Sequence, residues 1–517
     1  MADIFDDYQP AAAWDEMFER AGVPRAAYGP VLAALQPLDP AELRFRADQL
    51  ARVFTDRGVT FDYAGEERPF PLDLIPRVLD ALEWPTLERG VRQRVLALES
   101  FLADVYGPGE IFKDGLVPWR LISTSAHFHR EVSGLTPPNG VRAHISGIDL
   151  IRDEDGRFRV LEDNVRTPSG VSYVMENRLA MTRTFPGLFA EQHVHPVDEY
   201  PARLLAALRA SAPRDVADPV VAVLTPGVGN AAYFEHTLLA RLMGVELVEG
   251  RDLICAGNRV YIQTTQGRRP VHVIYRRIDD AYLDPLHFNG GSVIGCPGIV
   301  NAARAGNLTI ANAVGNGVAD DKLIYTYVPE MIRYYLGEEP VLDNVESYRL
   351  EDPDVISWVL DRLDRLVLKP VDGAGGKGIV IGPHADAATL EALRETVVRD
   401  PRGWLAQRPV SLSTVPTLTD RGPAPRHVDL RPFAVNDGED VWVLPGGLTR
   451  VALPEGELVV NSSQGGGSKD TWVLAADRSS AQAPEDPPIP LPRTFADVTV
   501  PQGGPGHGST IEGAQQQ

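Results

Sequence analysis

A run of glycines set between two strand-like stretches is the feature that most restricts how this chain can fold. LVLKPV (Leu366–Val371) leads into GAGGKG (Gly373–Gly378), and GIVIG (Gly378–Gly382) follows directly. Strand patterns on both sides predict that the glycines close an antiparallel hairpin. A dinucleotide fingerprint needs a helix after its glycines, and a Walker A loop needs Ser or Thr where this chain has Gly378. Both kinds of site are therefore excluded.

A glycine hairpin beside a lysine-bearing strand is typical of folds that close over the phosphates of ATP. Lys369 lies on the first strand, four residues before Gly373, where its ammonium group would neutralise phosphate oxygens. The other candidate phosphate contacts are in the loop itself: Gly373, Gly375, Gly376, Lys377 and Gly378. An ordinary glycine-rich hairpin without a ligand is the alternative.

A second predicted hairpin carries acidic residues at its open end. VRAHISGIDLIR (Val141–Arg152) and RFRVLEDN (Arg157–Asn164) flank the tight-turn signal DEDG. A two-residue turn there sets Asp149 opposite Glu162, and Asn164 points to the same side. Two carboxylates and an amide oxygen are ligands that Mg²⁺ takes together with waters and phosphates.

The alternative for this hairpin is a solvated acidic surface. Ile151, Phe158 and Val160 fall on the same predicted face as Asp149 and Glu162, which makes that face largely apolar. Acidic groups on a buried face need a cation or hydrogen-bond donors, so metal binding is favoured.

Other polar stretches give weaker candidates. RTPSG and PGGLTR place Arg166 and Arg450 as cationic groups, and YRRIDD places Arg276 in either a carboxylate-binding site or a self-paired loop. NSSQGGGSKD, which ends near Lys469, is either a phosphate loop or a flexible surface loop. For the histidine pairs we expect structural or surface roles; they are His127 with His129 and His193 with His195.

The charge balance restricts the partners. Fifty Lys and Arg residues stand against 71 Asp and Glu residues, a net charge of −21 with a pI near 5.0. Proteins that bind nucleic acid generally, or anionic membranes, need a basic face, so both classes are disfavoured. No stretch of about twenty apolar residues could span a bilayer, and the first residues lack a secretory signal pattern. We therefore expect a cytoplasmic protein.

Covalent chemistry based on cysteine or serine finds no support. Cys255 and Cys296, the two cysteines, are too few for a disulfide framework or a four-thiolate metal site. We expect both to be small buried hydrophobic residues rather than redox groups. No G-x-S-x-G elbow of a serine hydrolase is present.

Changes of periodicity divide the chain into units. Apolar residues recur at helical spacing over Asp39–Phe54 and Thr86–Tyr106. After the linker Ser211–Pro219, the order strand, glycine turn, helix and strand indicates parallel α/β pairing. The expected units are 1–130, mainly helical; 131–210, with the acidic hairpin; 215–300, α/β; 301–477, with the glycine loop; and 478–517, a disordered Pro/Gly/Gln-rich tail.

Taken together, these motifs resemble the ATP-grasp enzymes. The E-x-N of Glu162–Asn164, an aspartate thirteen residues earlier, and a lysine strand feeding a glycine loop are similar to their metal and nucleotide motifs. In the common order the nucleotide lysines come first, whereas here E-x-N comes first. The inverted order resembles the circularly permuted ATP-grasp proteins, type 2 branch, which are glutathionylspermidine synthase-like.

The resemblance implies an α/β fold made of α+β lobes, with a helical N-terminal region. Within it, 131–210 would be the metal-binding half of the large lobe and 301–477 the nucleotide-binding lobe with its glycine lid. The segment 215–300 would be an inserted, doubly wound pre-ATP-grasp domain.

The resemblance also implies roles for single residues. Lys322 and Lys369 would bind nucleotide phosphates, and Gln407 and Val410 would belong to the adenine hinge. Asp149, Glu162 and Asn164 would hold Mg²⁺. The related synthases carry an arginine two residues before the metal aspartate, where this chain has Gly147. The candidates to replace it are Arg142, Arg166 and Arg450.

By the same resemblance the protein would be an ATP-dependent carboxylate–amine ligase that uses ATP and Mg²⁺. A small-molecule or peptide carboxylate would form an acyl phosphate with release of ADP, and an amine would then form the amide or peptide bond. The alternatives are a phosphotransferase and a nucleotide-binding regulatory or assembly protein without turnover. No amidase segment with a cysteine nucleophile is recognisable, so a second activity of that kind is not expected.

Overall fold

The computed structural model describes residues 4–63, 66–373, 378–454, 456–457, 460 and 466–476. These residues belong to one unit that extends to Ala476. The predicted phosphate contacts Gly375, Gly376 and Lys377 lie outside the described residues, and so does the predicted tail 478–517. Those expectations stay predictions.

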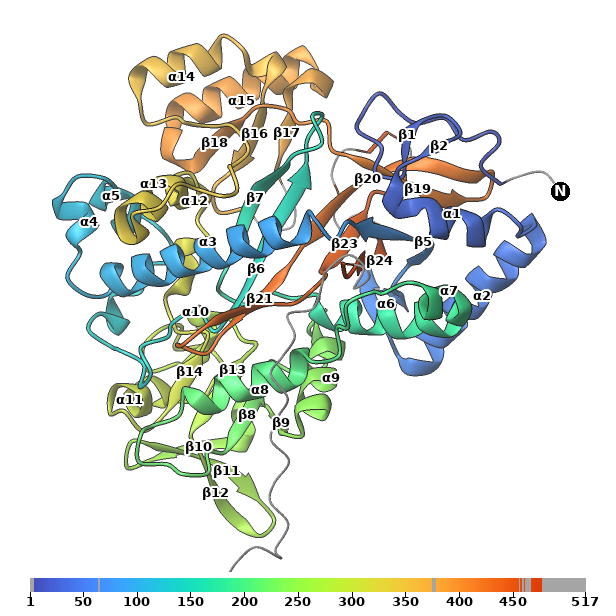
Figure 1. Ribbon diagram of the computed structural model, residues 1–517. Coiled ribbons are helices and arrows are strands. Elements are labelled where there is room, and N and C mark those ends of the chain that lie inside the picture. Colours follow the sequence, from blue (N-terminus) through green and yellow to red (C-terminus); the bar gives the residue numbers. More distant parts are fainter. Residues whose placement is uncertain are drawn as a thin grey trace, which may run out of the picture. The chain divides into compact units, whose positions relative to one another are not determined.

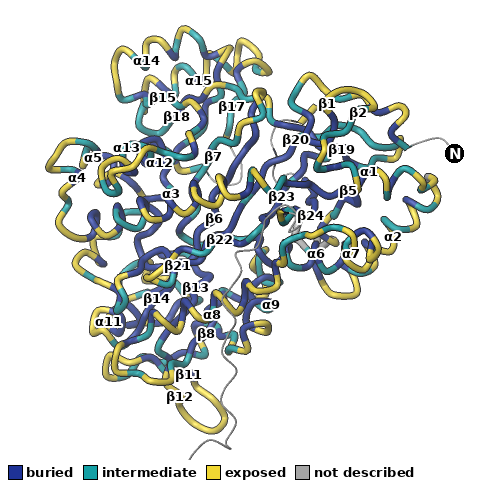
Figure 2. The backbone as a smooth tube through the Cα atoms, viewed as in Figure 1, coloured by how far each residue is buried: buried dark blue, intermediate teal, exposed yellow. Residues whose placement is uncertain are grey.

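Nine of the described strands form the largest sheet, in the order β22-β21-β6-β20-β23-β24-β5, with β7 paired to β6 and β19 to β20. Its strands are β5 (Leu72–Leu79), β6 (Ile145–Arg152), β7 (Phe158–Asn164), β19 (Thr414–Thr419), β20 (Gly422–Arg431), β21 (Phe433–Asn436), β22 (Val441–Val443), β23 (Leu448–Val451) and β24 (Gly467–Val473). The pairs are antiparallel except β24 with β5, which is parallel. Figure 2 shows that this sheet is mostly buried.

Helices predicted from apolar periodicity pack on this sheet. The prediction over Asp39–Phe54 is confirmed by α2 (Pro40–Arg57), whose first turn is capped by the Asp39 carboxylate accepting from Ala41 N and Glu42 N, each at 2.8 Å. The prediction over Thr86–Tyr106 is confirmed by α3 (Trp84–Val105). Buried Val91, Val95 and Leu98 lie on one side of α3, and this helix contacts β21 and β22.

Two further helices follow the acidic hairpin and also contact the large sheet. They are α6 (Val171–Thr184), against β23 and β24, and α8 (Tyr200–Ala210), against β21.

A smaller antiparallel sheet carries the glycine loop. Its order is β15-β18-β16-β17, with β15 (Ser347–Arg349), β16 (Val367–Pro370), β17 (Val380–Ile381) and β18 (Trp404–Gln407). Val367 pairs with Ile381 and Leu368 with Val380, which confirms the predicted hairpin. α14 (Pro353–Leu360) and α15 (Ala387–Arg399) share an apolar cluster with this sheet and appear beside it at the top of Figure 1.

The α/β unit holds a four-stranded parallel sheet, in the order β14-β13-β8-β9. Its strands are β8 (Val221–Leu224), β9 (Glu246–Val248), β13 (Val273–Arg276) and β14 (Thr309–Ala311). Beside it lie α9 (Tyr233–Met243) and the antiparallel strands β10 (Leu253–Ala256), β11 (Arg259–Thr264) and β12 (Gly267–Val271). The parallel pairing predicted after residue 219 is confirmed.

The remaining elements are short. The strands are β1 (Phe18–Arg20), β2 (Val23–Pro24), β3 (Thr60–Tyr63) and β4 (Glu66–Pro69). The helices are α1 (Gly29–Leu35), α4 (Glu110–Lys113), α5 (Trp119–Ser123), α7 (Pro186–Glu191), α10 (Asp280–Leu283), α11 (Ile299–Arg304), α12 (Lys322–Tyr325) and α13 (Val328–Met331). The single turns are η1 (Ala26–Tyr28), η2 (Arg130–Val132), η3 (Gly250–Asp252), η4 (Asn316–Ala319), η5 (Ile332–Leu336), η6 (Leu363–Arg365), η7 (Gly382–His384) and η8 (Pro401–Gly403).

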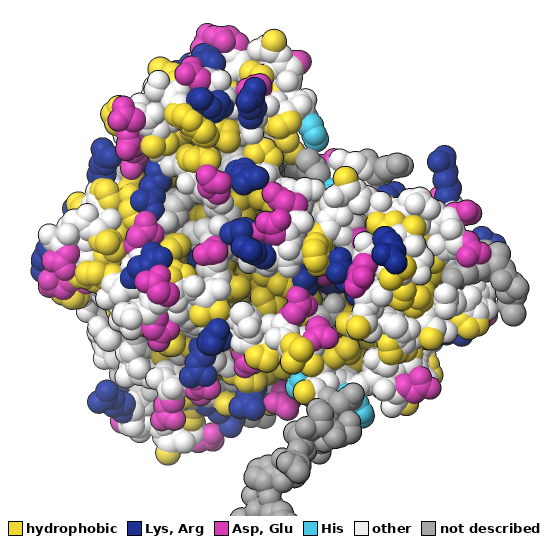
Figure 3. Space-filling model, turned by 45° about the horizontal axis from the view of Figure 1, so that its top comes forward, with side chains coloured by type: hydrophobic (Ala, Val, Ile, Leu, Met, Phe, Trp, Pro, Cys, Tyr) yellow, Lys and Arg dark blue, Asp and Glu magenta, His cyan; other side chains and the backbone are white. Residues whose placement is uncertain are grey.

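Two surface properties bear on partners. In the part of the chain that the structure describes, we find no helix both long and apolar enough to cross a membrane. On the face drawn in Figure 3, Lys and Arg side chains are interspersed with Asp and Glu side chains.

A buried ion pair ties the N-terminal residues to the large sheet. Arg77 on β5 donates to both carboxylate oxygens of Glu16, at 2.5 and 2.8 Å, and the two side chains are 0% and 2% exposed. Burial acts to raise the pKa of Glu16, but Arg77 and Arg152 outweigh it and hold that pKa at about 2.

We expect Arg77→Met to lower the free energy of unfolding by about 3–5 kcal/mol, because Glu16 keeps a buried charge without its main partner. Urea denaturation measures this loss. The matched control Arg269→Met, in an exposed pair with Glu246, should change it by less than about 1 kcal/mol. In the wild type, the stability that Glu16 contributes is complete above its ordinary pKa and is lost as the pH falls towards 2. Equal losses in both variants would contradict this account.

Candidate active site

The acidic hairpin forms as β6–β7, and its open end has the predicted register. Asp149 lies opposite Glu162, and Gly147 lies opposite Asn164. The register then shifts, because Leu150 pairs with Val160 and leaves Leu161 as an extra residue in β7. The regular pairing that we predicted towards the turn is therefore wrong, although it holds at the candidate metal ligands.

Asp149 is held by two arginines from neighbouring strands. Arg431 on β20 donates from Nε and Nη2 to the two carboxylate oxygens at 2.5 and 2.7 Å. Arg450 on β23 donates to Asp149 at 2.8 Å and to Asp429 at 2.5–3.0 Å. Burial acts to raise the pKa of Asp149, but the two guanidinium groups outweigh it and hold that pKa at about 2. Asp149 is thus an anion that positions two cations.

Arg431 is the main site residue that the sequence analysis missed. A Cβ at Gly147 would lie 3.2 Å from Arg431 Cδ and 3.4 Å from Arg431 Cγ, so the arginine stem covers the face of this glycine. A strand next to β6 therefore places an arginine side chain against Gly147. The pairing of Leu430 with Leu150 produces this arrangement.

Both predicted nucleotide lysines lie at the acidic hairpin. Lys322, the first residue of α12, is 3.9 Å from Glu162 Oε1 and donates to Gly373 O at 2.5 Å. Lys369 on β16 is half-buried, and its pKa is lowered to about 8. Burial is the main cause, the charge of Lys322 acts in the same direction, and Glu162 and Asp149 act to raise the pKa. The structure therefore brings these four charged groups to one place, although Asp149 and Lys369 are far apart in sequence.

Glu162 is the accessible carboxylate at this place. Its side chain is 35% exposed, whereas both carboxylate oxygens of its register partner Asp149 already accept from Arg431 and Arg450. Asn164 lies two residues along β7, and its buried Nδ2 has no hydrogen-bond partner among the described residues. Within the described ranges no group of three His, Cys, Asp or Glu side chains could hold a metal ion. A carboxylate and an amide oxygen, together with waters and phosphates, are ligands that Mg²⁺ takes.

The glycine loop and the predicted hinge border the same region. Gly378 is the first described residue after the loop, and its φ of +78° is a backbone conformation that favours glycine. Gln407, the last residue of β18, pairs with Val367 and Ser347, and its Nε2 donates to Ser347 Oγ at 2.9 Å. Val410 follows in the next loop and is half-buried. The side chain of Gln407 is thus engaged within the sheet, which leaves backbone groups after β18 as the candidates to meet a base.

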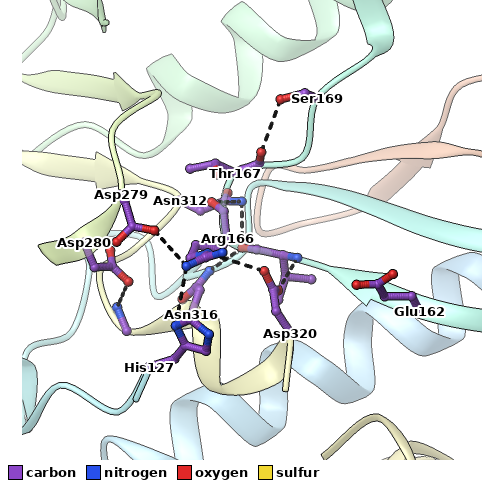
Figure 4. A network of polar contacts seen from close by, with 12 residues as sticks. His127, Glu162, Arg166, Thr167, Ser169, Asp279, Asp280, Asn312, Asn316 and Asp320 are labelled. Carbon is purple, nitrogen blue, oxygen red and sulfur yellow. Dashed lines mark hydrogen bonds and ion pairs between the residues drawn. The ribbon is translucent and has the colours of Figure 1, made fainter. Parts of the chain in front are cut away.

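Arg166 forms a polar network beyond the end of β7. Its Nη1 donates to Asp279 Oδ2 at 2.7 Å, and its Nε is 3.7 Å from Asp320 Oδ2. His127 Nδ1 is 3.4 Å from the same guanidinium. Figure 4 shows these side chains around Arg166, with Glu162 on the adjoining strand. Burial raises the pKa of Asp320 to about 7. His127, which we expected to be structural or superficial, therefore lies beside a candidate site residue.

Two other candidate arginines are buried and bonded within the fold. Arg276 is 0% exposed, and it donates to the backbone oxygens of Asn312, Ile278 and Ala313 and pairs with Asp280. A group that touches a substrate needs access, so the buried pair of Arg276 with Asp280 agrees with the self-paired alternative rather than with a carboxylate-binding site. Arg142 is also buried and donates to Leu135 O at 2.7 Å.

Lys469 corrects a further expectation. We considered it part of a phosphate loop or a flexible surface loop, but it lies on β24 and is 0% exposed. It pairs with Asp73 and donates to the backbone oxygens of Ile75 and Pro416. Its charge is therefore used inside the fold.

The lowered pKa of Lys369 predicts a pH dependence of ATP binding. The ammonium form attracts phosphates directly, whereas above pH 8 the free protein must take up a proton to bind. We expect the affinity for ATP to fall by up to about tenfold per pH unit above 8. Calorimetric titration with a non-hydrolysable ATP analogue between pH 7 and pH 9.5 measures this fall. In Lys369→Arg the slope should flatten, because a guanidinium stays charged; an unchanged slope would assign the dependence to another group.

Comparisons with known proteins agree with this geometry. Residues 76–452 match the family model described as circularly permuted ATP-grasp type 2. An uncharacterised protein of Mycobacterium tuberculosis is 61% identical over 498 residues, which cover 96% of this chain and 90% of that protein. A protein of Frankia casuarinae named putative glutamate–cysteine ligase 2-2 is 46% identical, over 91% of this chain and 54% of that protein. This chain thus spans about half of the Frankia protein.

One solved structure shares the fold at low sequence identity. The glutathione synthetase-like effector of Globodera pallida, in its apo form, superposes with a TM-score of 0.56 at 12% identity, over 84% of this chain and 98% of that one. The inverted motif order, the two-lobed arrangement of sheets and the family match agree. The chain belongs to the circularly permuted ATP-grasp type 2 family, and so to the ATP-dependent ligases of the ATP-grasp fold.

Proposed function

We propose that this protein joins a carboxylate to an amine at the expense of ATP, through an acyl phosphate and with release of ADP. The observation that carries the proposal is the convergence of Lys322, Lys369, Glu162 and Asp149. These groups come from three distant segments, and Lys322 also contacts Gly373 at the start of the glycine loop. Cations beside a hard-metal ligand set suit a triphosphate.

The charged side chains have separate tasks in this proposal. Lys322 and Lys369 would neutralise phosphate oxygens, and Glu162 and Asn164 would hold Mg²⁺ beside Asp149, which fixes Arg431 and Arg450; the bound ion would supply further neutralisation of phosphate charge. Gly373 and Gly378, the described residues on either side of the glycine loop, would contact the phosphates, as we predict for Gly375, Gly376 and Lys377. Backbone groups after Gln407, including those of Val410, would receive the adenine. No covalent nucleophile on the protein is needed, because alignment and electrostatics act on the transferred phosphoryl group.

Arg431 and Arg450 are the groups that would stabilise the transferred phosphoryl and the acyl phosphate. Both donate to Asp149, so their guanidinium groups are fixed next to the metal ligands before any substrate arrives. Preorganised donors of this kind are worth more than mobile ones, since they need no reorganisation during the reaction. Arg166 lies beyond the end of the same strand β7, with Asp279 and Asp320, and would face the acceptor amine.

The test is ADP release from Mg²⁺-ATP in the presence of candidate substrates. Glutamate with cysteine is the first pair, as suggested by the name of the Frankia relative, followed by amino-acid and peptide mixtures. We expect ADP to appear only when a carboxylate and an amine are both present, and mass spectrometry to find their condensation product. Hydroxylamine in place of the amine should trap the acyl phosphate as a hydroxamate.

Two results would overturn the proposal. A stable phosphorylated product formed without amine would assign a phosphotransferase. Tight ATP binding without ADP in any mixture, including a metabolite extract, would assign a nucleotide-binding regulatory or assembly protein. The variant Glu162→Gln controls for contaminating ATPases. ADP release that belongs to this protein should fall in the variant, whereas ADP release by a contaminant should not.

A further inference from the structure

The two cysteines of the chain lie in contact. Cys255 is on β10, and Cys296 precedes α11; they are 41 residues apart in sequence, and their Sγ atoms are 3.5 Å apart. The sequence holds two cysteines among 517 residues. We expected both to be small buried hydrophobic residues rather than redox groups, but the fold brings their thiols into contact.

The backbone around Cys296 imposes this contact. Cys296 N donates to Leu283 O at 2.9 Å, at the end of α10. The Asp284 carboxylate accepts from Gly298 N and Val300 N at 3.0 and 3.1 Å, which fixes the turn that follows. Gly298 has φ of +85°, and a Cβ there would lie 3.4 Å from Cys255 Cβ. The turn is therefore packed directly on Cys255.

The two thiols differ in access and in electrostatics. Cys296 is 0% exposed, whereas Cys255 is half-buried and reaches the surface. The hydrogen bond with Cys296 lowers the pKa of Cys255, while burial and the nearby Asp284 act to raise it. The same hydrogen bond, with burial, raises the pKa of Cys296. Cys255 is thus the thiol that an oxidant in solution can reach, and Cys296 is the buried thiol in contact with it.

We propose that Cys255 and Cys296 form a reversible disulfide with hydrogen peroxide as the oxidant. The Cys255 thiolate attacks one peroxide oxygen, the O–O bond breaks, and the leaving hydroxide takes a proton to become water. Cys296 then attacks the sulfur of the Cys255 sulfenic acid, the S–O bond breaks, and a second water leaves. Two thiols lose two electrons in total, and one peroxide gains them.

The required movement is small. A disulfide has an S–S length of about 2.05 Å, so the two sulfurs need to approach by about 1.5 Å through side-chain rotation. The bond would fasten β10 to the turn before α11. Leu283, which bonds Cys296, is the last residue of α10, and Asp279, which accepts from Arg166, directly precedes that helix. The disulfide would therefore also restrain the segment that carries Asp279. The proposal itself does not depend on the ligase assignment.

The test is thiol counting on the folded protein. The purified chain is treated with hydrogen peroxide, unfolded in the presence of iodoacetamide and weighed by intact mass spectrometry. We expect the untreated protein to take up two alkyl groups, the oxidised protein none, and dithiothreitol to restore both. Digestion should recover one peptide pair linked through Cys255 and Cys296, and the melting temperature of the monomer should rise on oxidation.

The single variants separate this mechanism from random oxidation. Cys296→Ser should stop at a Cys255 sulfenic acid that dimedone labels, whereas Cys255→Ser should leave the buried Cys296 unreacted. The proposal is overturned if both thiols of the folded wild type stay alkylatable after peroxide. It is equally overturned if the disulfide found is intermolecular, or if Cys255→Ser is oxidised as fast as Cys296→Ser.

Discussion

Glu162→Gln should lower ADP formation by about 10³-fold, which corresponds to about 4 kcal/mol of transition-state stabilisation. Glutamine keeps the size of the side chain and one oxygen ligand but removes the negative charge that faces Lys322. The affinity for Mg²⁺ should fall with the rate, so a Mg²⁺ titration should require higher concentrations for half of the remaining activity. Steady-state ADP release at several Mg²⁺ concentrations measures both effects.

Glu154→Gln is the matched control for this variant. Glu154 lies at the turn of the same hairpin, and its exposed carboxylate pairs with Arg408 at 3.4 Å. An exposed pair of this kind contributes at most about 1 kcal/mol to stability, and the rate should stay at the wild-type value. Equal rates for Glu162→Gln and the wild type would remove the metal assignment, whatever the reaction proves to be.

Arg431→Ala should lower kcat by about 10²–10³-fold with a smaller effect on KM for ATP, because a preorganised donor acts mainly on charge that develops in the transition state. Arg431→Lys should recover part of the loss, since it returns the charge without the two-pronged contact to Asp149. Arg450 still pairs with Asp149 in both variants, which limits the damage to the fold. Thermal melting of each variant verifies that the protein is folded.

Arg426→Ala tests whether any arginine on β20 gives the same result. Arg426 lies on the same strand and donates to the backbone oxygen of Leu453 at 2.8 Å, away from Asp149. Its kcat should be unchanged. If Arg431→Ala loses affinity for ATP and keeps its kcat, then Arg431 binds the nucleotide in the ground state, and the stabilising arginine must be Arg450 or Arg166.

The candidate metal and nucleotide residues come from local patterns in the sequence, and the structure brings four of them to one place. The two-residue turn that we predicted sets Asp149 opposite Glu162. Near the turn the strands instead pair Arg152 with Phe158, and the bulge at Leu161 restores the predicted pairing of Asp149 with Glu162. The bulge at Leu161 could not be foreseen, because Val160 also bonds with Asp343 and Val345, which are remote in sequence. Local patterning sets the hairpin, and tertiary contacts set its irregularity.

Arg431 escaped prediction for a related reason. The sequence around Arg431 does not indicate that β20 lies beside β6. The contact of Arg431 with Gly147 therefore becomes known only from the folded chain. The same limit applies to β5, which joins the large sheet although residues 1–130 were predicted to be mainly helical. Arg276 and Lys469 show the converse error, since a polar residue in a loop-like pattern can equally be a buried partner of backbone oxygens.

The parallel pairing of β5 with β24 has a consequence for synthesis on the ribosome. Asp73 and its partner Lys469 are separated by 396 residues, so an elongation rate of 5–20 residues per second leaves β5 without its neighbour for roughly 20–80 s. During that interval a mostly apolar edge is open to other nascent chains. Molecular chaperones that shield such edges should therefore bind this chain during translation and release it once β24 has been synthesised.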